Sequence, residues 1–177
     1  ADFYYQILKL NNKKVASIGT LGVKSKNINL NLSNTTIDPL KLGQILTNLK
    51  NQKVENVIME ASSHGLKQHR LDGLKFNSGI FTNLSQDHLD YHKNLKSYLK
   101  AKLYLFESLI KKKGSVITDQ KIPEFREIKK ITQNKKLKLY TLNDKKNNLE
   151  VISHSFKGES QLLKIKYNNS IRDIRVN

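Results

Sequence analysis

The spacing of hydrophobic residues along the chain alternates between two kinds of pattern. Apolar residues at helical spacing predict amphipathic helices over residues 1–10, 39–50, 94–112 and 121–133. Short apolar runs between these segments predict buried strands over residues 13–22, 54–59, 79–82 and 115–118. Residues 24–37 are rich in Asn, Ser and Thr and are expected to form a loop. Strands that alternate with helices in this way indicate an α/β fold with a mostly parallel sheet flanked by helices.

The clearest helix start is the pair Asp38 and Pro39. An Asp side chain can accept hydrogen bonds from the first free amides of a helix, and proline suits the first helical position. The pattern changes again from about residue 137. Four segments of alternating apolar and polar residues then predict an antiparallel meander at one edge of the sheet, at residues 137–142, 148–156, 161–167 and 170–176. Turn signals separate the later segments, namely Lys157-Gly158 and Asn168-Asn169.

The net charge of the chain is compatible with a nucleic-acid partner, but the type and distribution of its basic residues argue against one. The 177 residues, enough for one domain, carry 32 basic and 15 acidic side chains, a formal net charge of +17. Arginine, which reads guanine edges and clamps phosphates, occurs at only four positions, and the longest basic run is Lys111–Lys113. The excess charge is spread along the chain. A lysine-rich solvated surface is therefore favoured over a nucleic-acid site.

Two features that the sequence lacks exclude further classes of protein. The chain has no cysteine, which rules out disulfides and thiolate metal sites and fits a cytoplasmic protein. No apolar run approaches the ~18 residues that a transmembrane helix needs. We therefore expect a cytoplasmic protein that does not span a membrane.

Polar residues capable of chemistry gather in two stretches, residues 60–70 and 82–92. Glu60 follows an apolar strand directly, the usual position for a carboxylate that holds Mg²⁺ on a nucleotide phosphate. A helix-capping role is the plainer alternative for Glu60. Asp87-His88 follows the next predicted strand, so Glu60 and His88 can face one crevice if the two strands are neighbours. For Asp87, Asp90 and His92 the plainer role is to cap and orient the segment before the helix at 94–112.

Two cationic residues are unusual for their positions. Lys102 lies on the apolar stripe of the predicted helix at 94–112, where its aliphatic stem can pack while the ammonium reaches water. The alternative is a partly buried neutral amine, because burial disfavours charge, and a neutral amine reacts with carbon dioxide to give an anionic carbamate. Arg70, in a chain that otherwise uses lysine, indicates a need for fork geometry toward a carboxylate or phosphate. Asn34, Thr35, Thr36 and Ser62-Ser63 offer neutral donors, although each alone is more typical of turns.

Taken together, five segments resemble the Mur ligase family, and within it the MurE type. They match in order and spacing over nearly the whole chain: IGTLG at 18–22, NTTIDPL at 34–40, MEASSHGLKQHR at 59–70, FTNLSQDHLDYH at 81–92 and YLKAKLYLF at 98–106. The stretch SSHGLKQHR distinguishes this type from its sister ligases. The fold that the resemblance implies is the P-loop-type central domain of these enzymes.

The resemblance also implies an activity and a set of partners. ATP would phosphorylate the D-Glu carboxylate of UDP-N-acetylmuramoyl-L-Ala-D-Glu, and the amine of a diamino acid would attack the acyl phosphate. Glu60 and His88 match the family's magnesium ligands, and Lys102 matches a lysine that becomes carbamylated at the same metal site. The positions that match the family's binding site for the UDP-muramoyl-dipeptide are Asn34, Thr35, Thr36, Ser62, Gln68 and Arg70. The partners implied are this nucleotide, ATP and the diamino acid, with Mg²⁺ as cofactor, no nucleic acid, no membrane and a monomeric state.

The chain departs from the family pattern at both ends. The family's glycine-rich ATP-binding loop would lie before Ala1, and no such loop with its lysine occurs in this sequence. We therefore expect residues 1–177 to be a central domain cut at both ends, without the N-terminal uridine-binding domain and the C-terminal domain. Whether the added residue is meso-diaminopimelate or L-lysine is left open, because the C-terminal domain makes that choice.

Three alternatives remain at this point. A related ligase could add another amino acid or glutamate, as folylpolyglutamate-type enzymes do. A basic nucleic-acid-binding module would bind DNA or RNA with a steep dependence on salt concentration. A metal-dependent hydrolase could use Asp87, His88, Asp90 and His92, although their spacing matches no defined metal motif.

We expect the 177-residue chain alone to have no ligase activity, because it lacks the loop that would bind ATP phosphates. The measurement is phosphate release in the presence of ATP, Mg²⁺ and the UDP-muramoyl-dipeptide. Release that depends on both substrates would contradict the expectation.

Overall fold

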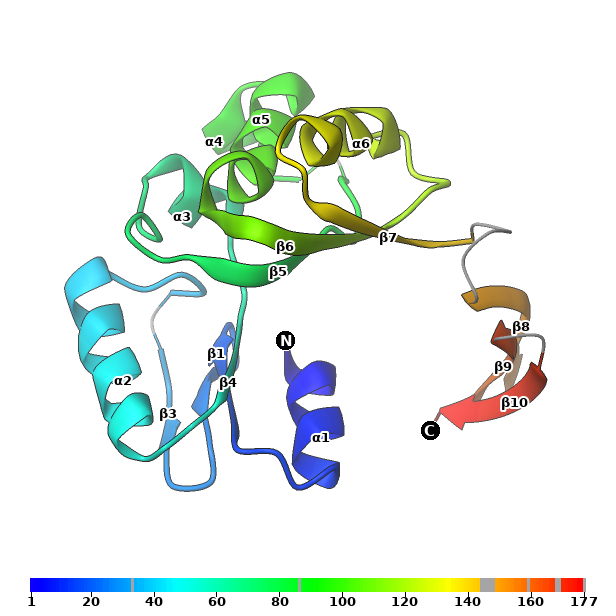
Figure 1. Ribbon diagram of the computed structural model, residues 1–177, viewed down its shortest axis with the longest axis horizontal. Helices are drawn as coiled ribbons and strands as arrows, with labels where there is room; N and C mark the ends of the chain where they lie inside the picture. Colours follow the sequence, from blue (N-terminus) through cyan, green and yellow to red (C-terminus); the bar gives the residue numbers. More distant parts are fainter. Residues whose placement is uncertain (33, 86, 144–148, 159, 168–169, 177) are drawn as a thin grey trace. The chain divides into compact units, whose positions relative to one another are not determined.

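The computed structural model describes residues 1–32, 34–85, 87–143, 149–158, 160–167 and 170–176 (Figure 1). The chain divides into two compact units, and each is described by itself. Unit 1 comprises Ala1–Leu74 and His88–Leu105, and unit 2 comprises Lys75–Asp87 and Phe106–Asn177. The α/β class with a parallel sheet and helices is confirmed, as is an antiparallel sheet in the C-terminal part of the chain.

Unit 1 is built on a four-stranded sheet in the order β3-β2-β1-β4. Its strands are β1 (Val15–Gly19), β2 (Gly22–Lys24), β3 (Asn29–Leu30) and β4 (Asn56–Met59). β1 is buried along its whole length and pairs in parallel with β4 and antiparallel with β2. The single strand expected over 13–22 is wrong, because Thr20 and Leu21 turn the chain back on itself. Gly22 makes this turn possible with a φ of +86°.

The described residues of unit 1 also form five helices (Figure 1). They are α1 (Asp2–Leu10), α2 (Pro39–Asn51), α3 (Ser63–Lys67), α4 (Leu89–His92) and α5 (Leu95–Tyr104). The predicted helix start at Asp38 is confirmed, since its carboxylate accepts hydrogen bonds from the amides of Leu40 and Lys41 at 2.8 and 3.4 Å. The loop expected over 24–37 contains the short strand β3, whose amides pair with β2.

The helix expected over 94–112 ends earlier than its apolar pattern predicts. The α-helical part stops at Tyr104, a π-helical turn η1 follows over Leu105–Leu109, and β6 begins at Ile110. β6 has a strand on each side, so its backbone groups are hydrogen-bonded in the sheet. Sheet pairing therefore overrides the local helical pattern of residues 110–112.

In unit 2 the parallel sheet has the order β5-β6-β7. Its strands are β5 (Phe76–Ile80), β6 (Ile110–Asp119) and β7 (Lys138–Leu142), with α6 (Phe125–Asn134) between the last two. Figure 1 shows α6 against one face of this sheet, and its Ile128 and Thr132 are buried. Placing 137–142 in an antiparallel meander is wrong, because β7 pairs in parallel with β6. A helix between two adjacent strands makes them parallel, since the crossover returns the chain to the starting edge.

The remaining strands of unit 2 form a sheet of their own. β8 (Leu149–Lys157), β9 (Ser160–Tyr167) and β10 (Ser170–Val176) pair antiparallel in the order β10-β9-β8. The sequence pattern predicts that these strands continue one edge of the parallel sheet. This prediction is wrong, because they form a separate sheet. The turn expected at Lys157-Gly158 is present, with Gly158 at φ +60°. The expected turn at Asn168-Asn169 lies outside the described residues. In the part of the chain that the structure describes, no helix has the length and hydropathy needed to cross a membrane.

Gly79 is a closely packed position in unit 2. A Cβ at this buried position would lie 2.7 Å from Cε1 of Phe106 and 3.1 Å from Cδ1 of Ile110. Gly79→Ala is therefore expected to lower the free energy of unfolding by about 1–3 kcal/mol through overpacking.

The matched control is Gly43→Ala, at an exposed position of α2 where a Cβ would meet nothing within 4 Å. This substitution should raise the free energy of unfolding by about 0.5–1 kcal/mol through helix propensity. Urea unfolding of both variants measures the two effects. Equal stability of the two variants would contradict the packing argument.

Candidate functional site

Glu60 follows β4, and its carboxylate lies over the end of β1. The parallel ladder continues to this residue, whose amide donates to the carbonyl oxygen of Ile18 at 2.9 Å. Gly19 leaves the room that the side chain occupies, since a Cβ there would lie 2.5 Å from Cδ of Glu60. Thr20 donates twice to Oε2 of Glu60, from its amide at 2.8 Å and from its hydroxyl at 2.9 Å. The β1–β2 turn thus fixes one carboxylate oxygen.

The other oxygen of Glu60, Oε1, lies 3.3 Å from the nitrogen of Ala1. Burial raises the pKa of Glu60, but the hydrogen bonds from the amide and hydroxyl of Thr20 lower it, and the net effect is a lowered pKa. The carboxylate is therefore ionised near neutral pH. A crevice of about 10 Å³, close to the volume of one water molecule, adjoins it and is lined by Ala1, Asp2, Ser17, Gly19, Leu21, Gly22 and Glu60.

Thr36 connects the segment 34–36 to the chain that follows Glu60. Its buried hydroxyl lies 3.3 Å from the carbonyl oxygen of Glu60 and 2.9 Å from the hydroxyl of Ser62, and it accepts from the amide of Ser62 at 2.9 Å. Arg70 donates to the carbonyl oxygen of Thr36 at 2.7 Å. Three of the residues expected to bind substrate, Thr36, Ser62 and Arg70, are therefore in direct contact.

Helix α3 packs closely against this segment. Ser62 caps the helix by accepting from the amide of Gly65 at 3.1 Å. A Cβ on Gly65 would clash with the side chain of Thr36, so only glycine permits this approach. Thr35 joins the same region from the other side, with its hydroxyl 3.0 Å from that of Thr20. Asn34 is exposed, and no contact joins it to the other expected substrate residues within the described chain.

A cluster of histidine and tyrosine rings lies between α3, α4 and α5. The ring of His64 is 4.1 Å from that of Tyr91, 5.0 Å from that of His88 and 5.5 Å from that of His92, measured between centroids. Gln68, another expected substrate residue, donates to the hydroxyl of Tyr91 at 3.0 Å. The residues of α3 are thereby joined to the segment that carries His88.

His88 and Lys102 each lie near the ring of Tyr98. The ring of His88 is 6.0 Å from the ring of Tyr98, and Nζ of Lys102 lies 4.9 Å from the centroid of the same ring. His88 precedes α4 in the left-handed conformation, at φ +55°, and its side chain is exposed. Lys102 is half-buried, as its place on the apolar stripe of the helix predicts. Two of the three expected metal ligands therefore share one aromatic neighbour, whereas Glu60 lies in the hydrogen-bonded network of Thr20.

The acidic and histidine residues of the described chain, Glu60 and His88 included, do not form a cluster of metal ligands. Within the described ranges, no three His, Asp or Glu side chains are close enough together to hold a metal ion. His92 is 1% exposed and its Nε2 lies 2.9 Å from the hydroxyl of Ser63, so it is a core residue. The helix that follows, α5, is capped by Asn94, whose side chain accepts from the amide of Ser97 at 2.8 Å. A hydrolase site at 87–92 has no support here.

Four residues of the site were not singled out by sequence reasoning, namely Thr20, His64, Tyr91 and Tyr98. Thr20 lies in the matched segment 18–22, and its position directly after a buried strand was the available signal. The two tyrosines have no pattern of their own, because their contacts come from helices that pack together in space.

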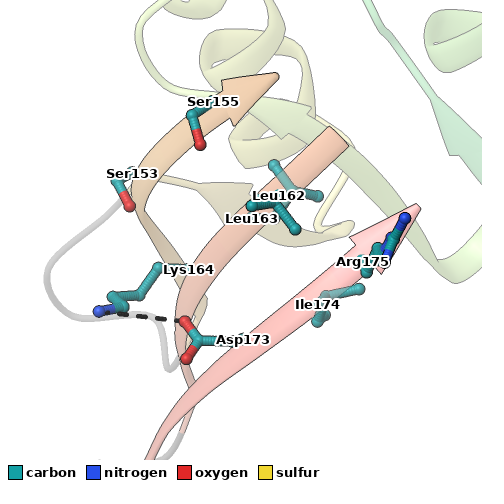
Figure 2. Close-up of a pocket in the computed structure, with 8 residues that line it drawn as sticks. All are labelled: Ser153, Ser155, Leu162, Leu163, Lys164, Asp173, Ile174 and Arg175. Atoms are coloured by element: carbon teal, nitrogen blue, oxygen red, sulfur yellow. Dashed lines mark ion pairs between the residues drawn. The ribbon is translucent and has the colours of Figure 1, made fainter. Parts of the chain in front are cut away.

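A hollow of another kind lies on the antiparallel sheet of unit 2. Its volume is about 400 Å³, and it opens on the face of β8, β9 and β10 that carries Ser153, Ser155, Lys164 and Asp173. Figure 2 shows the ammonium of Lys164 and the carboxylate of Asp173 facing each other, 4.0 Å apart. No residue of this hollow is among those expected to bind substrate or metal.

Burial lowers the pKa of two histidines of the ring cluster, His64 and His92. Loss of water around the rings lowers the pKa of both His64 and His92, and the nearby His88, Lys67 and Arg70 lower the pKa of His64 further. A histidine whose pKa is lowered in the folded state stabilises the fold at pH values above the ordinary histidine pKa of ~6.5. As the pH falls below that value, the unfolded chain binds protons that the folded chain does not. The free energy of unfolding should therefore decrease between pH 7 and pH 5.

Urea unfolding at several pH values measures this loss, and His92→Phe should make the pH dependence shallower. His154→Gln, at an exposed position of β8, is the control and should leave the slope unchanged. An unchanged slope in His92→Phe would contradict the assignment of His92 as a buried neutral group.

Comparisons with known proteins agree with this arrangement. The model of the Mur ligase middle domain matches residues 1–177. A UDP-N-acetylmuramoyl-L-alanyl-D-glutamate–2,6-diaminopimelate ligase of Zymomonas mobilis is 33% identical over 176 residues, which are 99% of this chain and 36% of that protein. The ligase of the same name from Rickettsia montanensis is 40% identical over 166 residues, 90% of this chain and 34% of that protein. The chain thus spans about a third of the length of these curated relatives.

Solved structures give the same result. A structure of a UDP-N-acetylmuramoyl-L-alanyl-D-glutamate–2,6-diaminopimelate ligase superposes with a TM-score of 0.83 at 25% identity, covering 98% of this chain and 35% of that one. The MurF ligase from Thermotoga maritima, solved in complex with ADP, superposes with a TM-score of 0.63 at 13% identity, over 97% of this chain and 36% of that one, which shows a shared fold alone. From the match along its whole length and these relatives, the chain belongs to the Mur ligase family, as a MurE-like middle domain.

Proposed function

We propose that this chain is the middle domain of an ATP-dependent ligase that joins 2,6-diaminopimelate to UDP-N-acetylmuramoyl-L-Ala-D-Glu. Two relatives named for this activity match 90% or more of the chain, although the chain spans about a third of their length. The diamino acid, which the sequence left open, is taken from those names. The parent protein would then also contain the uridine-binding and amino-acid-binding domains that residues 1–177 lack.

The observation that carries the proposal is the fixed carboxylate of Glu60. Thr20 engages Oε2 twice, through its amide and its hydroxyl, and leaves Oε1 available to a metal ion. Carboxylate oxygen is the ligand type that Mg²⁺ prefers, and Mg²⁺ keeps several waters when only one or two side chains bind it. The donor set therefore fits magnesium. A magnesium ion held by Glu60 would offset negative charge on the ATP phosphates.

His88 and Lys102 are proposed as the further members of this metal site. Lys102 in its ammonium form is a cation and cannot ligate a metal. As a carbamate it would instead present two oxygens and a negative charge. The Tyr98 ring, which contacts both residues, would hold His88 and Lys102 at the same part of the site.

The phosphates of ATP would approach Glu60 from the amino end of α1. Ala1 precedes this helix and its nitrogen lies 3.3 Å from Oε1 of Glu60. A phosphate-binding loop joined to Ala1 would therefore end beside the carboxylate. Helix amino ends attract phosphate through their free amides and the positive end of the helix dipole.

The muramoyl-dipeptide would bind along the residues that Thr36 ties together. Arg70 uses one guanidinium nitrogen on the carbonyl oxygen of Thr36, and the described chain supplies no partner for the rest of its fork. The guanidinium keeps donors for a substrate carboxylate or phosphate. Gln68, Ser62, Thr35 and Asn34 would add neutral hydrogen bonds. Their anchoring on α3 and the 34–36 segment would hold the D-Glu carboxylate near the metal for phosphoryl transfer from ATP.

The test is performed on the full-length ligase. It should add 2,6-diaminopimelate to UDP-N-acetylmuramoyl-L-Ala-D-Glu with release of ADP and phosphate, in a reaction that requires Mg²⁺. Glu60→Gln keeps the shape but removes the charge, and it should reduce kcat roughly 100-fold, because metal-based stabilisation amounts to several kcal/mol. Steady-state phosphate release measures the effect.

Glu55→Gln is the matched control, since Glu55 is exposed and precedes the same strand. It should leave kcat unchanged. A Glu60→Gln enzyme with the kcat of the unmodified ligase would refute the role of Glu60, and a ligase that accepts L-lysine in place of 2,6-diaminopimelate would refute the substrate assignment.

A further inference from the structure

We infer that Thr20 is a positioning residue, which holds Oε2 of Glu60 so that Oε1 faces the cation and which links this carboxylate to the substrate segment through Thr35. The inference rests on the proposed function, because it concerns the magnesium carboxylate of that site. Thr20 is not among the residues for which the family resemblance implies a role.

The first step is the double hydrogen bond to a single oxygen. The amide and the hydroxyl of Thr20 both reach Oε2 of Glu60, at 2.8 and 2.9 Å. A carboxylate held twice at one oxygen cannot rotate to exchange its two oxygens without breaking both bonds. Thr20 does not engage Oε1, which is left for the cation.

The second step concerns the single proton of the Thr20 hydroxyl. This proton is donated to Oε2 of Glu60. The hydroxyls of Thr20 and Thr35 lie 3.0 Å apart, so Thr35 must donate in that pair. The two hydrogen bonds are therefore donated in the same direction, from Thr35 to Thr20 and from Thr20 to Glu60. Hydrogen bonds aligned in this way polarise one another, which strengthens the bond that reaches the carboxylate.

The third step is that the backbone leaves Thr20 little freedom to move. It occupies a two-residue turn between β1 and β2, whose ends are paired at Gly19 and Gly22. Gly19 cannot carry a side chain without displacing Glu60, and Gly22 at φ +86° has the carbonyl oxygen of Leu30 where a Cβ would lie. The close contacts of Gly19 with Glu60 and of Gly22 with Leu30 therefore fix both sides of the turn. The Thr20 hydroxyl is held at the position from which it reaches both Glu60 and Thr35.

A purely structural role would not account for this arrangement. Thr20 is exposed, so its side chain contributes little buried apolar area to the core. A threonine that served only the turn would not need its hydroxyl on a carboxylate forty positions away in the sequence. The partners that it does have, Glu60 and Thr35, are respectively a proposed metal ligand and a proposed substrate residue.

The experiment uses the full-length ligase and Mn²⁺ as a probe of the magnesium site, with binding measured by electron paramagnetic resonance in the presence of a non-hydrolysable ATP analogue. Thr20→Val keeps the shape and the amide but removes the hydroxyl. Its Mn²⁺ affinity should fall about 10-fold, the lower end of the effect of losing a group that orients a metal ligand. Thr20→Ser restores the hydroxyl and should recover most of the affinity.

Two further variants separate positioning from folding. Thr35→Val does not touch Glu60, yet it should also weaken Mn²⁺ binding, and the double variant should lose less than the product of the two single effects. The KM for the UDP-muramoyl-dipeptide should rise in both single variants. Thr47→Val, on the exposed side of α2, is the control and should change neither quantity.

The outcomes distinguish this inference from the proposed function. If Thr20→Val binds Mn²⁺ like the unmodified ligase while Glu60→Gln does not, the inference is overturned and the proposed function stands. If Glu60→Gln also binds Mn²⁺ normally, both are overturned. If Thr20→Val fails to fold, Thr35→Val with normal Mn²⁺ affinity overturns the inference, and weakened affinity in Thr35→Val together with recovery in Thr20→Ser supports it.

Discussion

The parallel pairing of β1 with β4 is the constraint on which the site depends. The register aligns Ile18 with Met59, and the amide of Glu60 extends the ladder to the carbonyl oxygen of Ile18. Parallel strands end at the same edge of a sheet, so the residue after β4 lies beside the turn after β1. The carboxylate of Glu60 consequently lies over Gly19 and within reach of Thr20. A register shift of one residue would turn the carboxylate to the other face of the sheet.

Thr36 links the region around Glu60 to the residues proposed to bind substrate. It is buried, and its hydroxyl and carbonyl oxygen are engaged by Ser62 and Arg70, which belong to a different part of the chain. The segment 34–36 contains little regular secondary structure and would otherwise have few backbone partners. Gly65 allows α3 to approach until the two segments are in contact. The polar groups proposed to bind substrate are therefore held by a short chain of hydrogen bonds that leads back to the Glu60 carbonyl oxygen.

The electrostatics of unit 1 differ from the strongly basic average of the chain. Burial raises the pKa of Glu60, but its hydrogen bonds from Thr20 lower it, so that the pKa is lowered overall and the carboxylate is ionised. Nearby, burial favours the neutral form of His64 and His92, so these rings add no positive charge beside Lys67 and Arg70 at neutral pH. Neutral rings can then pack edge-to-face and stacked against Tyr91 and Tyr98. A charged cluster at this place would repel its own neighbours.

The sequence by itself determined the elements whose cause is local. The Asp38 side chain accepts hydrogen bonds from the amides two and three residues further on. The apolar run of residues 15–19 accounts for the burial of β1. The motif residues also identified the family. The sequence did not determine where the helix after Asn94 ends, nor that 138–142 joins a parallel sheet, because both depend on pairing with strands that are distant in sequence.

Only the tertiary structure decided how the chemistry is assembled. Thr20 and Glu60 are forty positions apart, and Lys102 and His88 are linked through the ring of Tyr98, which lies near both. Side-chain spacing along the chain carries no record of these contacts. They arise when strands and helices are brought together in the fold, and a hydrogen bond between distant residues depends on that packing to within a few tenths of an ångström.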